Sequence, residues 1–294
     1  MQEPRDQRIY TGTVHIQVRD YPQQGEAILF LHYGGANLMM WQDVVPFFME
    51  KYHVILIDMR GHGKSDKPYQ EYHLDQIADD IQSVLQQMGV LQAHIVGSSL
   101  GAEAGLNLAA RYPQTVASLV CEGALYSEYG PYGLWEGSEE SFQDHVNQIL
   151  EKRKHAPETV FASLDDLVDQ TQAFFDEPGW WNSTFESVTR YDAIPIGDGR
   201  YVKSWGRMAE SYNQHYHFYR FEDYYRKLQC PVMMMPDTNP GQTDREKEVM
   251  LALSALVTNC KIVAVPEWVH PFGWMITPES ASRAVLEFLE ETRS

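Results

Sequence analysis

Short apolar segments alternate with longer segments of helical periodicity over the first 122 residues. Each apolar segment is four or five residues long and is followed by polar or turn-forming residues, which is typical of a buried strand. These segments are residues 27–31, 54–58, 94–97 and 118–121. Between them, residues 74–88 place apolar side chains at helical spacing. The alternation predicts an α/β fold, in which a mostly parallel, twisted sheet is covered by helices on both faces.

The strand–helix alternation stops after Glu122 and returns at residues 231–235 and 261–265, before a closing helix at 278–291. The segment between, residues 123–229, contains 21 of the 36 aromatic residues. We expect it to be a mostly helical cap inserted into a core formed by residues 1–122 and 230–294. Its aromatic side chains either form the core of the cap or line an apolar pocket beneath it.

The net charge of the chain narrows the classes of partner that we expect. Among 294 residues, 41 are acidic and 23 are basic, which gives a net charge of −18. Such a chain is repelled by nucleic acid and by anionic membranes, so a small-molecule substrate is the expected partner. Three cysteines, no signal-peptide pattern and no long apolar run predict a soluble, cytoplasmic protein. Nothing in the sequence indicates the oligomeric state.

The strongest local motif is Gly97-Ser98-Ser99-Leu100-Gly101, which lies between an apolar strand and an alanine-rich helix. A G-x-S-x-G sequence in this context is typical of a nucleophile elbow, whose tight turn requires small residues beside the serine. The helix that follows supplies free N–H groups and a dipole that favour developing negative charge. The motif predicts that Ser99 is a nucleophile; the alternative is a structural turn serine.

A serine nucleophile requires a base, and the position of His270 distinguishes it among eleven histidines. His270 lies between the last expected strand and the closing helix. Because loops that follow parallel strands meet at one edge of a sheet, we expect His270 to lie near Ser99. Neither a metal ion nor an organic cofactor is expected at this site.

The block Asp58-Met59-Arg60-Gly61-His62-Gly63-Lys64-Ser65-Asp66-Lys67-Pro68, together with the elbow, is similar to sequences of the α/β-hydrolase family. The resemblance covers nearly the full chain, and the block is similar to the loop after the fourth strand in the epoxide-hydrolase, dehalogenase and esterase branches. Dehalogenases and epoxide hydrolases have aspartate where this chain has Ser99. The resemblance therefore implies a serine branch: esterases, lipases, lactonases, carbon–carbon bond hydrolases or perhydrolases.

The same resemblance implies a catalytic acid after the penultimate strand, but Asn239 occupies the usual position in Pro236-Asp237-Thr238-Asn239-Pro240. Asp237 is the preferred candidate. Glu122 and Glu128, after the preceding strand, are alternative acids, and the absence of a working acid is a further alternative. The outcome matters, because loss of the acid in a serine protease lowers turnover about 10⁴-fold.

The family pattern also implies an oxyanion hole. One donor is the N–H of Leu100, directly after the nucleophile, and the other comes from the loop after the strand at residues 27–31. In the sequence His32-Tyr33-Gly34-Gly35, Gly34 occupies the matching position. Tyr33 stands where glycine is usual, either as a filler or as an additional donor.

The predicted function is hydrolysis of an ester or lactone bond through an acyl-enzyme. The substrate is expected to be small, uncharged and partly apolar, because the segment 123–229 contains few cations in its aromatic stretches. The same fold and triad also suit a perhydrolase, a carbon–carbon hydrolase or a lyase. A ligand-binding protein without catalysis remains an alternative from a different class.

Overall fold

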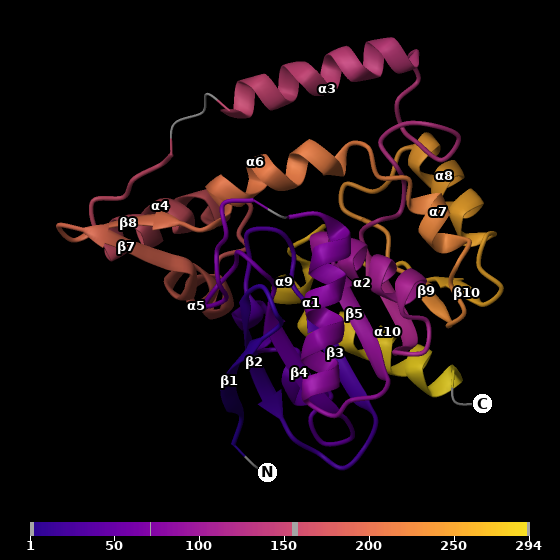
Figure 1. Cartoon of the computed structure of the whole chain (residues 1–294), viewed down its shortest axis with the longest axis horizontal. Coiled ribbons are helices and arrows are strands. Elements are labelled where there is room, and N and C mark those ends of the chain that lie inside the picture. Colours follow the sequence, from indigo (N-terminus) through magenta and orange to yellow (C-terminus); the bar gives the residue numbers. More distant parts are fainter. Residues whose placement is uncertain (1–2, 71, 155–157, 293–294) are drawn as a thin grey trace.

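An eight-stranded sheet forms the centre of the computed structural model, which describes residues 3–70, 72–154 and 158–292 (Figure 1). The strand order is β1-β2-β4-β3-β5-β6-β9-β10. β1 and β2 pair antiparallel, as do β2 and β4, whereas all other neighbours are parallel. The strands are β1 Arg5–Tyr10, β2 His15–Tyr21, β3 Ala27–Leu31, β4 His53–Asp58, β5 Ala93–Ser98, β6 Val116–Glu122, β9 Val232–Met234 and β10 Cys260–Ile262.

Helices cover both faces of this sheet, and each face has its own apolar cluster. All five residues of β3 are buried; Leu29 and Leu31 belong to one cluster, and Ile28 and Phe30 to the other. Because successive strand residues point to opposite faces, fully apolar strands can fill both clusters at once. The helices of the first face are α1 Leu74–Gln87, α2 Leu100–Arg111 and α8 Asp244–Ser254; those of the second are the 3₁₀ helices η1 Leu38–Trp41 and η2 Val45–Phe47, with α9 Gly273–Ile276 and α10 Pro278–Glu291.

The chain between β6 and β9 is mainly helical and lies along one edge of the sheet (Figure 1). It also contains the antiparallel hairpin β7–β8, which the sequence pattern does not predict. This insertion confirms the expected architecture, while its boundaries at residues 123 and 229 stay a prediction. Its elements are α3 Glu139–Lys154, α4 Leu164–Asp176, α5 Ser183–Asp192, β7 Ala193–Gly197, β8 Arg200–Lys203, α6 Trp205–Tyr216 and α7 Phe221–Tyr225.

The expected strands before residue 123 coincide with β3, β4, β5 and β6, and the expected helices at residues 74–88, after the elbow and at 278–291 coincide with α1, α2 and α10. The last strand, β10, ends at Ile262 rather than at residue 265. The sequence interpretation misses β1 and β2. In β1, five of the six residues are exposed and no apolar alternation marks the strand. This polar edge strand is identified by its pairing with β2, not by burial of its side chains.

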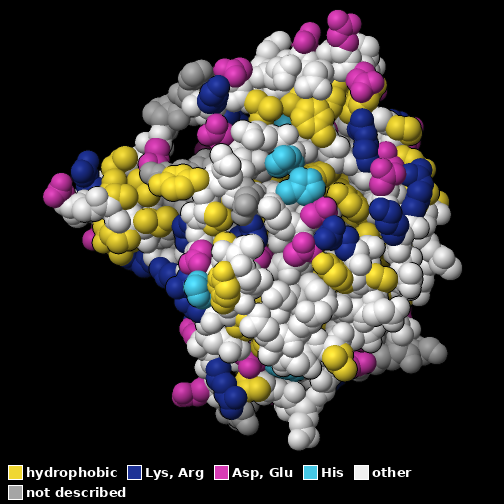
Figure 2. Space-filling view, in the orientation of Figure 1, with side chains coloured by type: hydrophobic (Ala, Val, Ile, Leu, Met, Phe, Trp, Pro, Cys, Tyr) yellow, Lys and Arg dark blue, Asp and Glu magenta, His cyan; other side chains and the backbone are white. Residues whose placement is uncertain are grey.

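Acidic and basic side chains are interspersed on the face of the molecule that Figure 2 shows. Exposed apolar side chains gather around the β7–β8 hairpin, at the left of this view, and Ile196 of β7 is one of the exposed hydrophobic residues. Within the described ranges, no helix has the length and apolar composition to cross a membrane.

Candidate active site

Ser99 lies at a sharp turn between the end of β5 and the start of α2. Its backbone has φ 49° and ψ −117°, in a region that non-glycine residues rarely adopt. The backbone N–H of Ser99 donates to the carbonyl of Glu122 at 2.5 Å, and the Ser99 carbonyl accepts from the N–H of Ala102 at 2.8 Å. These bonds hold the strained turn in place, as the elbow motif predicts.

Glycines make this turn possible because the surrounding backbone leaves no room for a side chain. A Cβ on Gly101 would lie 2.1 Å from the carbonyl oxygen of Leu31, and one on Gly97 would lie 2.4 Å from that of Gly101. Gly123 has φ +128°, and a Cβ there would lie 2.8 Å from Cα of Ser99. The first turn of α2 therefore packs directly against the end of β3, as well as against β5.

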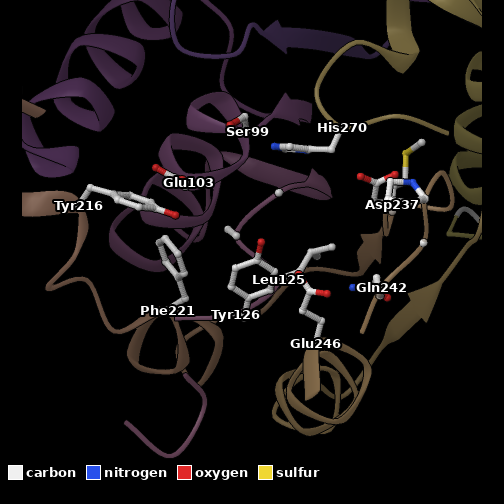
Figure 3. A pocket seen from close by; sticks show the side chains of 15 residues that line it. Ser99, Glu103, Leu125, Tyr126, Tyr216, Phe221, Asp237, Gln242, Glu246 and His270 are labelled. Atoms are coloured by element: carbon white, nitrogen blue, oxygen red, sulfur yellow. The ribbon is translucent and has the colours of Figure 1, made fainter. Parts of the chain in front are cut away.

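His270 lies in the loop between β10 and α9, and its imidazole ring extends toward Ser99 (Figure 3). Its Nδ1 lies 2.5 Å from Oε1 of Glu122. Burial lowers the pKa of His270, but the charge and the hydrogen bond of Glu122 more than offset this, so that the pKa is raised overall. A carboxylate at Nδ1 leaves Nε2 as the nitrogen that can exchange a proton with a nucleophile.

Glu122 is fully buried, and three donors hold its carboxylate. Besides His270, the hydroxyl of Ser98 donates to Oε2 at 2.5 Å, and the indole N–H of Trp268 donates to Oε1 at 3.3 Å. The position follows from strand register: Ser98 at the end of β5 pairs with Glu122 at the end of β6. Glu122 therefore lies on the adjacent strand, opposite Ser98, which is the residue before the nucleophile candidate Ser99.

Asp237, the acid preferred from the sequence, has a different environment. Its carboxylate accepts from the backbone N–H of Asn239 at 3.1 Å and lines the cavity beside Ser99. Burial raises the pKa of Asp237, although backbone N–H groups of Asn239 and His270 act in the opposite direction. Glu122, and not Asp237, therefore faces Nδ1 of His270, while the role of either residue as the catalytic acid stays a prediction.

Glu128, the other alternative acid, lies farther along the loop after β6. Its Oε1 accepts a hydrogen bond of 2.8 Å from the hydroxyl of Tyr216 in α6. The structure therefore brings Ser99, His270 and Glu122 together and places Glu128 at the aromatic wall of the cavity.

Leu100 is the first residue of α2, so its backbone N–H has no acceptor within the helix. Gly34 lies in the turn after β3, where the N–H of Ala36 donates to the carbonyl of Tyr33 at 3.1 Å. The N–H of Gly35 donates to Nε2 of His62 at 3.0 Å. These bonds order the turn beside the elbow, and the oxyanion roles of Leu100 and Gly34 stay a prediction.

Residues 58–68 form hydrogen bonds with the loop after β3. The buried carboxylate of Asp58 accepts from the N–H groups of Leu38 and Lys64, each at 2.8 Å. His62 is fully buried, and burial lowers its pKa, so the neutral ring accepts from Gly35. The block therefore acts as a scaffold for the loop after β3, which explains its characteristic residues without a catalytic role.

A cavity of about 270 Å³ opens beside Ser99 and His270. The carboxyl ends of the parallel strands and the segment between β6 and β9 both contribute to its lining (Figure 3). Its side chains include the aromatic residues Tyr126, Tyr216 and Phe221 and the acidic residues Glu103, Asp237 and Glu246. Some aromatic residues of the insertion therefore line a pocket, whereas others, such as Tyr225, are fully buried in the main core.

The sequence interpretation misses Glu103, which lies one helical turn after Ser99 on α2. Only 6% of this residue is exposed, and its Oε2 has no hydrogen-bond partner among the described residues. Burial raises the pKa of Glu103 to about 8; His270 acts in the opposite direction, and Glu128 adds to the increase. The i, i+4 spacing from the nucleophile is the signal that could have identified it.

Within the part of the chain that the structure describes, no group of three or more His, Cys, Asp or Glu side chains is arranged to hold a metal ion.

Comparisons with known proteins agree with this fold. The family model of the alpha/beta hydrolase fold matches residues 26–212, which is more than half of the chain. The enzyme 3-oxoadipate enol-lactonase 2 of Acinetobacter baylyi is 39% identical over 110 residues, 37% of this chain and 41% of that enzyme. A bifunctional esterase/perhydrolase of Acinetobacter calcoaceticus is 27% identical over 273 residues, covering 87% of this chain and 90% of that protein.

Among solved structures, E-2-(acetamidomethylene)succinate hydrolase superposes with a TM-score of 0.78 at 21% identity, covering 98% of this chain and all of that chain. This likeness concerns the fold. The sheet and the family match define a protein with the alpha/beta hydrolase fold. The chain belongs to the alpha/beta hydrolase family.

Proposed function

We propose that the protein is a serine hydrolase that cleaves an ester or lactone bond of a small molecule. The observation that carries this proposal is the 2.5 Å contact between Nδ1 of His270 and Glu122, with the opposite edge of the ring directed at Ser99. A nucleophile, a base and an orienting acid in this order form a charge-relay arrangement of the serine-hydrolase type. Glu122 takes the role of the acid, in place of Asp237.

In the proposed reaction, Oγ of Ser99 attacks the substrate carbonyl carbon while Nε2 of His270 accepts the hydroxyl proton. The N–H groups of Leu100 and Gly34 stabilise the oxyanion. The imidazolium then protonates the leaving alcohol oxygen as the carbon–oxygen bond breaks, which leaves an acyl group on Ser99. His270 next removes a proton from water, whose oxygen attacks the acyl carbon, and the returned proton restores Ser99.

The names of the relatives support the bond type rather than the substrate. One relative is named as an enol-lactonase and another as an esterase and perhydrolase. The enol-lactonase match spans 41% of that enzyme, so its particular substrate is not transferred to this chain. An ester or lactone with a partly apolar acyl or alcohol group suits a cavity lined by aromatic rings.

Perhydrolysis is the second candidate, because the relative that aligns over 87% of the chain is named for both activities. Hydrogen peroxide would then replace water as the nucleophile that attacks the acyl-enzyme, releasing a peracid. Product analysis with and without peroxide, on one ester substrate, distinguishes the two activities.

Intact-mass measurement after treatment with a fluorophosphonate tests the proposal directly. We expect one adduct on the wild-type protein and none on Ser99→Ala, because only an activated serine attacks the reagent. Absence of an adduct on folded wild-type protein, or an adduct that persists in Ser99→Ala, would contradict the assignment. Hydrolysis of 4-nitrophenyl butyrate by the same two proteins then measures the activity.

A further inference from the structure

Acidic side chains outnumber basic ones in the described lining of the cavity. Three carboxyl side chains, Glu103, Asp237 and Glu246, face it, and none of its described lining residues is Lys or Arg. The chain as a whole carries a net charge of −18. Such a field draws cations toward the opening and repels carboxylates and phosphates.

Two of these carboxyl groups already have partners. Glu246 accepts from the backbone N–H of Thr243 at 2.7 Å and from its hydroxyl at 2.8 Å, which caps α8. Asp237 accepts from the N–H of Asn239. Glu103 differs from both, because it is nine-tenths buried and its Oε2 has no hydrogen bond within the described structure. A buried carboxyl group without a partner is costly, and in a substrate pocket the ligand can supply that partner.

Aromatic rings surround the same space. Tyr216 lies beside Glu103 in Figure 3, and Phe221 and Tyr126 continue this wall of the cavity. The hydroxyl of Tyr216 donates to Glu128, which is a fourth carboxylate next to this wall. Ring faces attract cations, and several rings together with carboxylates form the kind of site that binds ammonium and quaternary ammonium groups.

Building on the proposed hydrolase function, we propose that the substrate carries a positively charged ammonium or quaternary ammonium group, which binds between Glu103 and the ring of Tyr216. This changes the expectation of an uncharged substrate. It also separates this chain from relatives whose names denote carboxylic acids, such as 3-oxoadipate and 2-(acetamidomethylene)succinate. Glu103 acts as a specificity-determining residue, because it contacts the part of the substrate that does not react.

Binding to the Ser99→Ala protein tests this site independently of turnover. The probes are (3-hydroxypropyl)trimethylammonium, its uncharged isostere 4,4-dimethylpentan-1-ol, and the anion 4-hydroxybutanoate, each titrated by ligand-observed NMR. The first two differ only in a quaternary nitrogen in place of a quaternary carbon. We expect the cation to bind more tightly than the isostere, and the anion to bind most weakly.

The second arm compares Ser99→Ala/Glu103→Gln with Ser99→Ala/Glu287→Gln. Both variants lose one glutamate, but Glu287 is exposed on α10 and does not line the cavity. At pH 9, above the pKa of about 8 that burial gives Glu103, Glu103→Gln should reduce the cation-to-isostere affinity ratio about tenfold, because it removes the negative charge beside the cation, while Glu287→Gln leaves the ratio unchanged. Glutamine has nearly the same shape and replaces no hydrogen bond of Oε2, so the fold should persist.

A second variant, Tyr216→Leu, should also lower the ratio because it removes the ring and keeps an apolar side chain. Equal or tighter binding of the uncharged isostere, preference for the anion, or a ratio unaffected by Glu103→Gln would overturn the cation site. Fluorophosphonate labelling of wild-type protein tests the proposed hydrolase separately, so failure of either proposal is recognised without the other.

Discussion

On one side of the cavity, Glu122 is held by three hydrogen-bond donors, whereas on the other side Oε2 of Glu103 has none among the described residues. Both glutamates are buried and lie close to the elbow. We call the group formed by Ser99, His270 and Glu122 the serine side; Ser99 and His270 line the cavity, and Glu122 is buried beside His270. A group that must keep one geometry throughout a reaction is best held by the protein itself.

The aromatic side, formed by Glu103, Tyr216 and Phe221, is built differently. Glu103 lies there without a partner for Oε2, and rings rather than donors surround the space. On such a surface the ligand supplies the missing partner of Oε2 of Glu103. The binding free energy from this interaction is therefore gained only when a matching substrate is present. The comparison predicts that substitutions on the serine side change the chemical step, whereas those on the aromatic side change which substrates bind.

The largest effect is expected from Ser99→Ala. Removing the hydroxyl eliminates the acyl-enzyme route, so kcat for a 4-nitrophenyl ester should fall by about 10⁶-fold, the size seen when a serine hydrolase loses its nucleophile. Stopped-flow and long-time assays on matched protein samples measure the difference. Ester hydrolysis within about tenfold of the wild type would show that Ser99 is not the nucleophile.

The next largest effect concerns the acid. Glu122→Gln should lower kcat about 10⁴-fold, because an amide at Nδ1 of His270 favours the wrong tautomer. Asp237→Asn, the matched substitution at the other candidate, should change kcat less than about tenfold. Steady-state kinetics of both variants decide the assignment, and the reverse order of effects would restore Asp237 as the acid.

Glu103→Gln should change the pH dependence of stability. Burial raises the pKa of Glu103 to about 8 from an ordinary value of 4.5, with His270 opposing and Glu128 adding to the increase. The folded chain therefore binds this proton more tightly than the unfolded chain. The contribution of Glu103 to the free energy of unfolding consequently decreases as pH rises from about 4.5 to about 8.

In Glu103→Gln this decrease is absent. The stability of the variant relative to the wild type should therefore rise by about 4 kcal/mol between pH 5 and pH 9. Urea unfolding at the two pH values measures it, with Glu287→Gln as the exposed control. Unfolding free energies that change in parallel for wild type and Glu103→Gln would show that Glu103 is ionised in the free protein.

The smallest effect is a displacement of the pH–rate profile. His270 must be neutral to accept a proton, and its pKa is raised because Glu122 outweighs the effect of burial. The acidic limb of kcat/KM should therefore lie above the ordinary histidine value in the wild type. In the residual activity of Glu122→Gln it should move to lower pH, since the charge and hydrogen bond of Glu122, the largest effects that raise the pKa of His270, are lost. If the acidic limb does not move, the pKa that it reports belongs to a group other than His270.

Most of the sheet is predictable because its central strands are buried on both faces. Residues 27–31 and 54–58 are recognisable from apolar content alone, and they form β3 and most of β4. β1 and the hairpin β7–β8 are not predictable in this way, since each strand has at most one buried residue. Their pairing partners, rather than burial, determine them.

In the candidate site, too, some residues are identifiable from local sequence and others only from tertiary contacts. Ser99 and His270 are identified from local sequence, because the elbow needs glycines at fixed spacing and a loop after a parallel strand reaches one known edge. The acid is not local: Asp237, Glu122 and Glu128 all follow strands that end at this edge. Only the register of β5 with β6, which pairs Ser98 with Glu122, decides which carboxylate reaches His270.

The sequence by itself thus determined the family resemblance, the central strands, the nucleophile candidate and the base candidate, since each depends on neighbours along the chain. The tertiary structure alone decided the partner of His270 and the isolation of Glu103 in the cavity. Both depend on which side chains meet across separate elements, and hydrogen bonds and burial act over a few ångströms in space, whatever the distance in sequence.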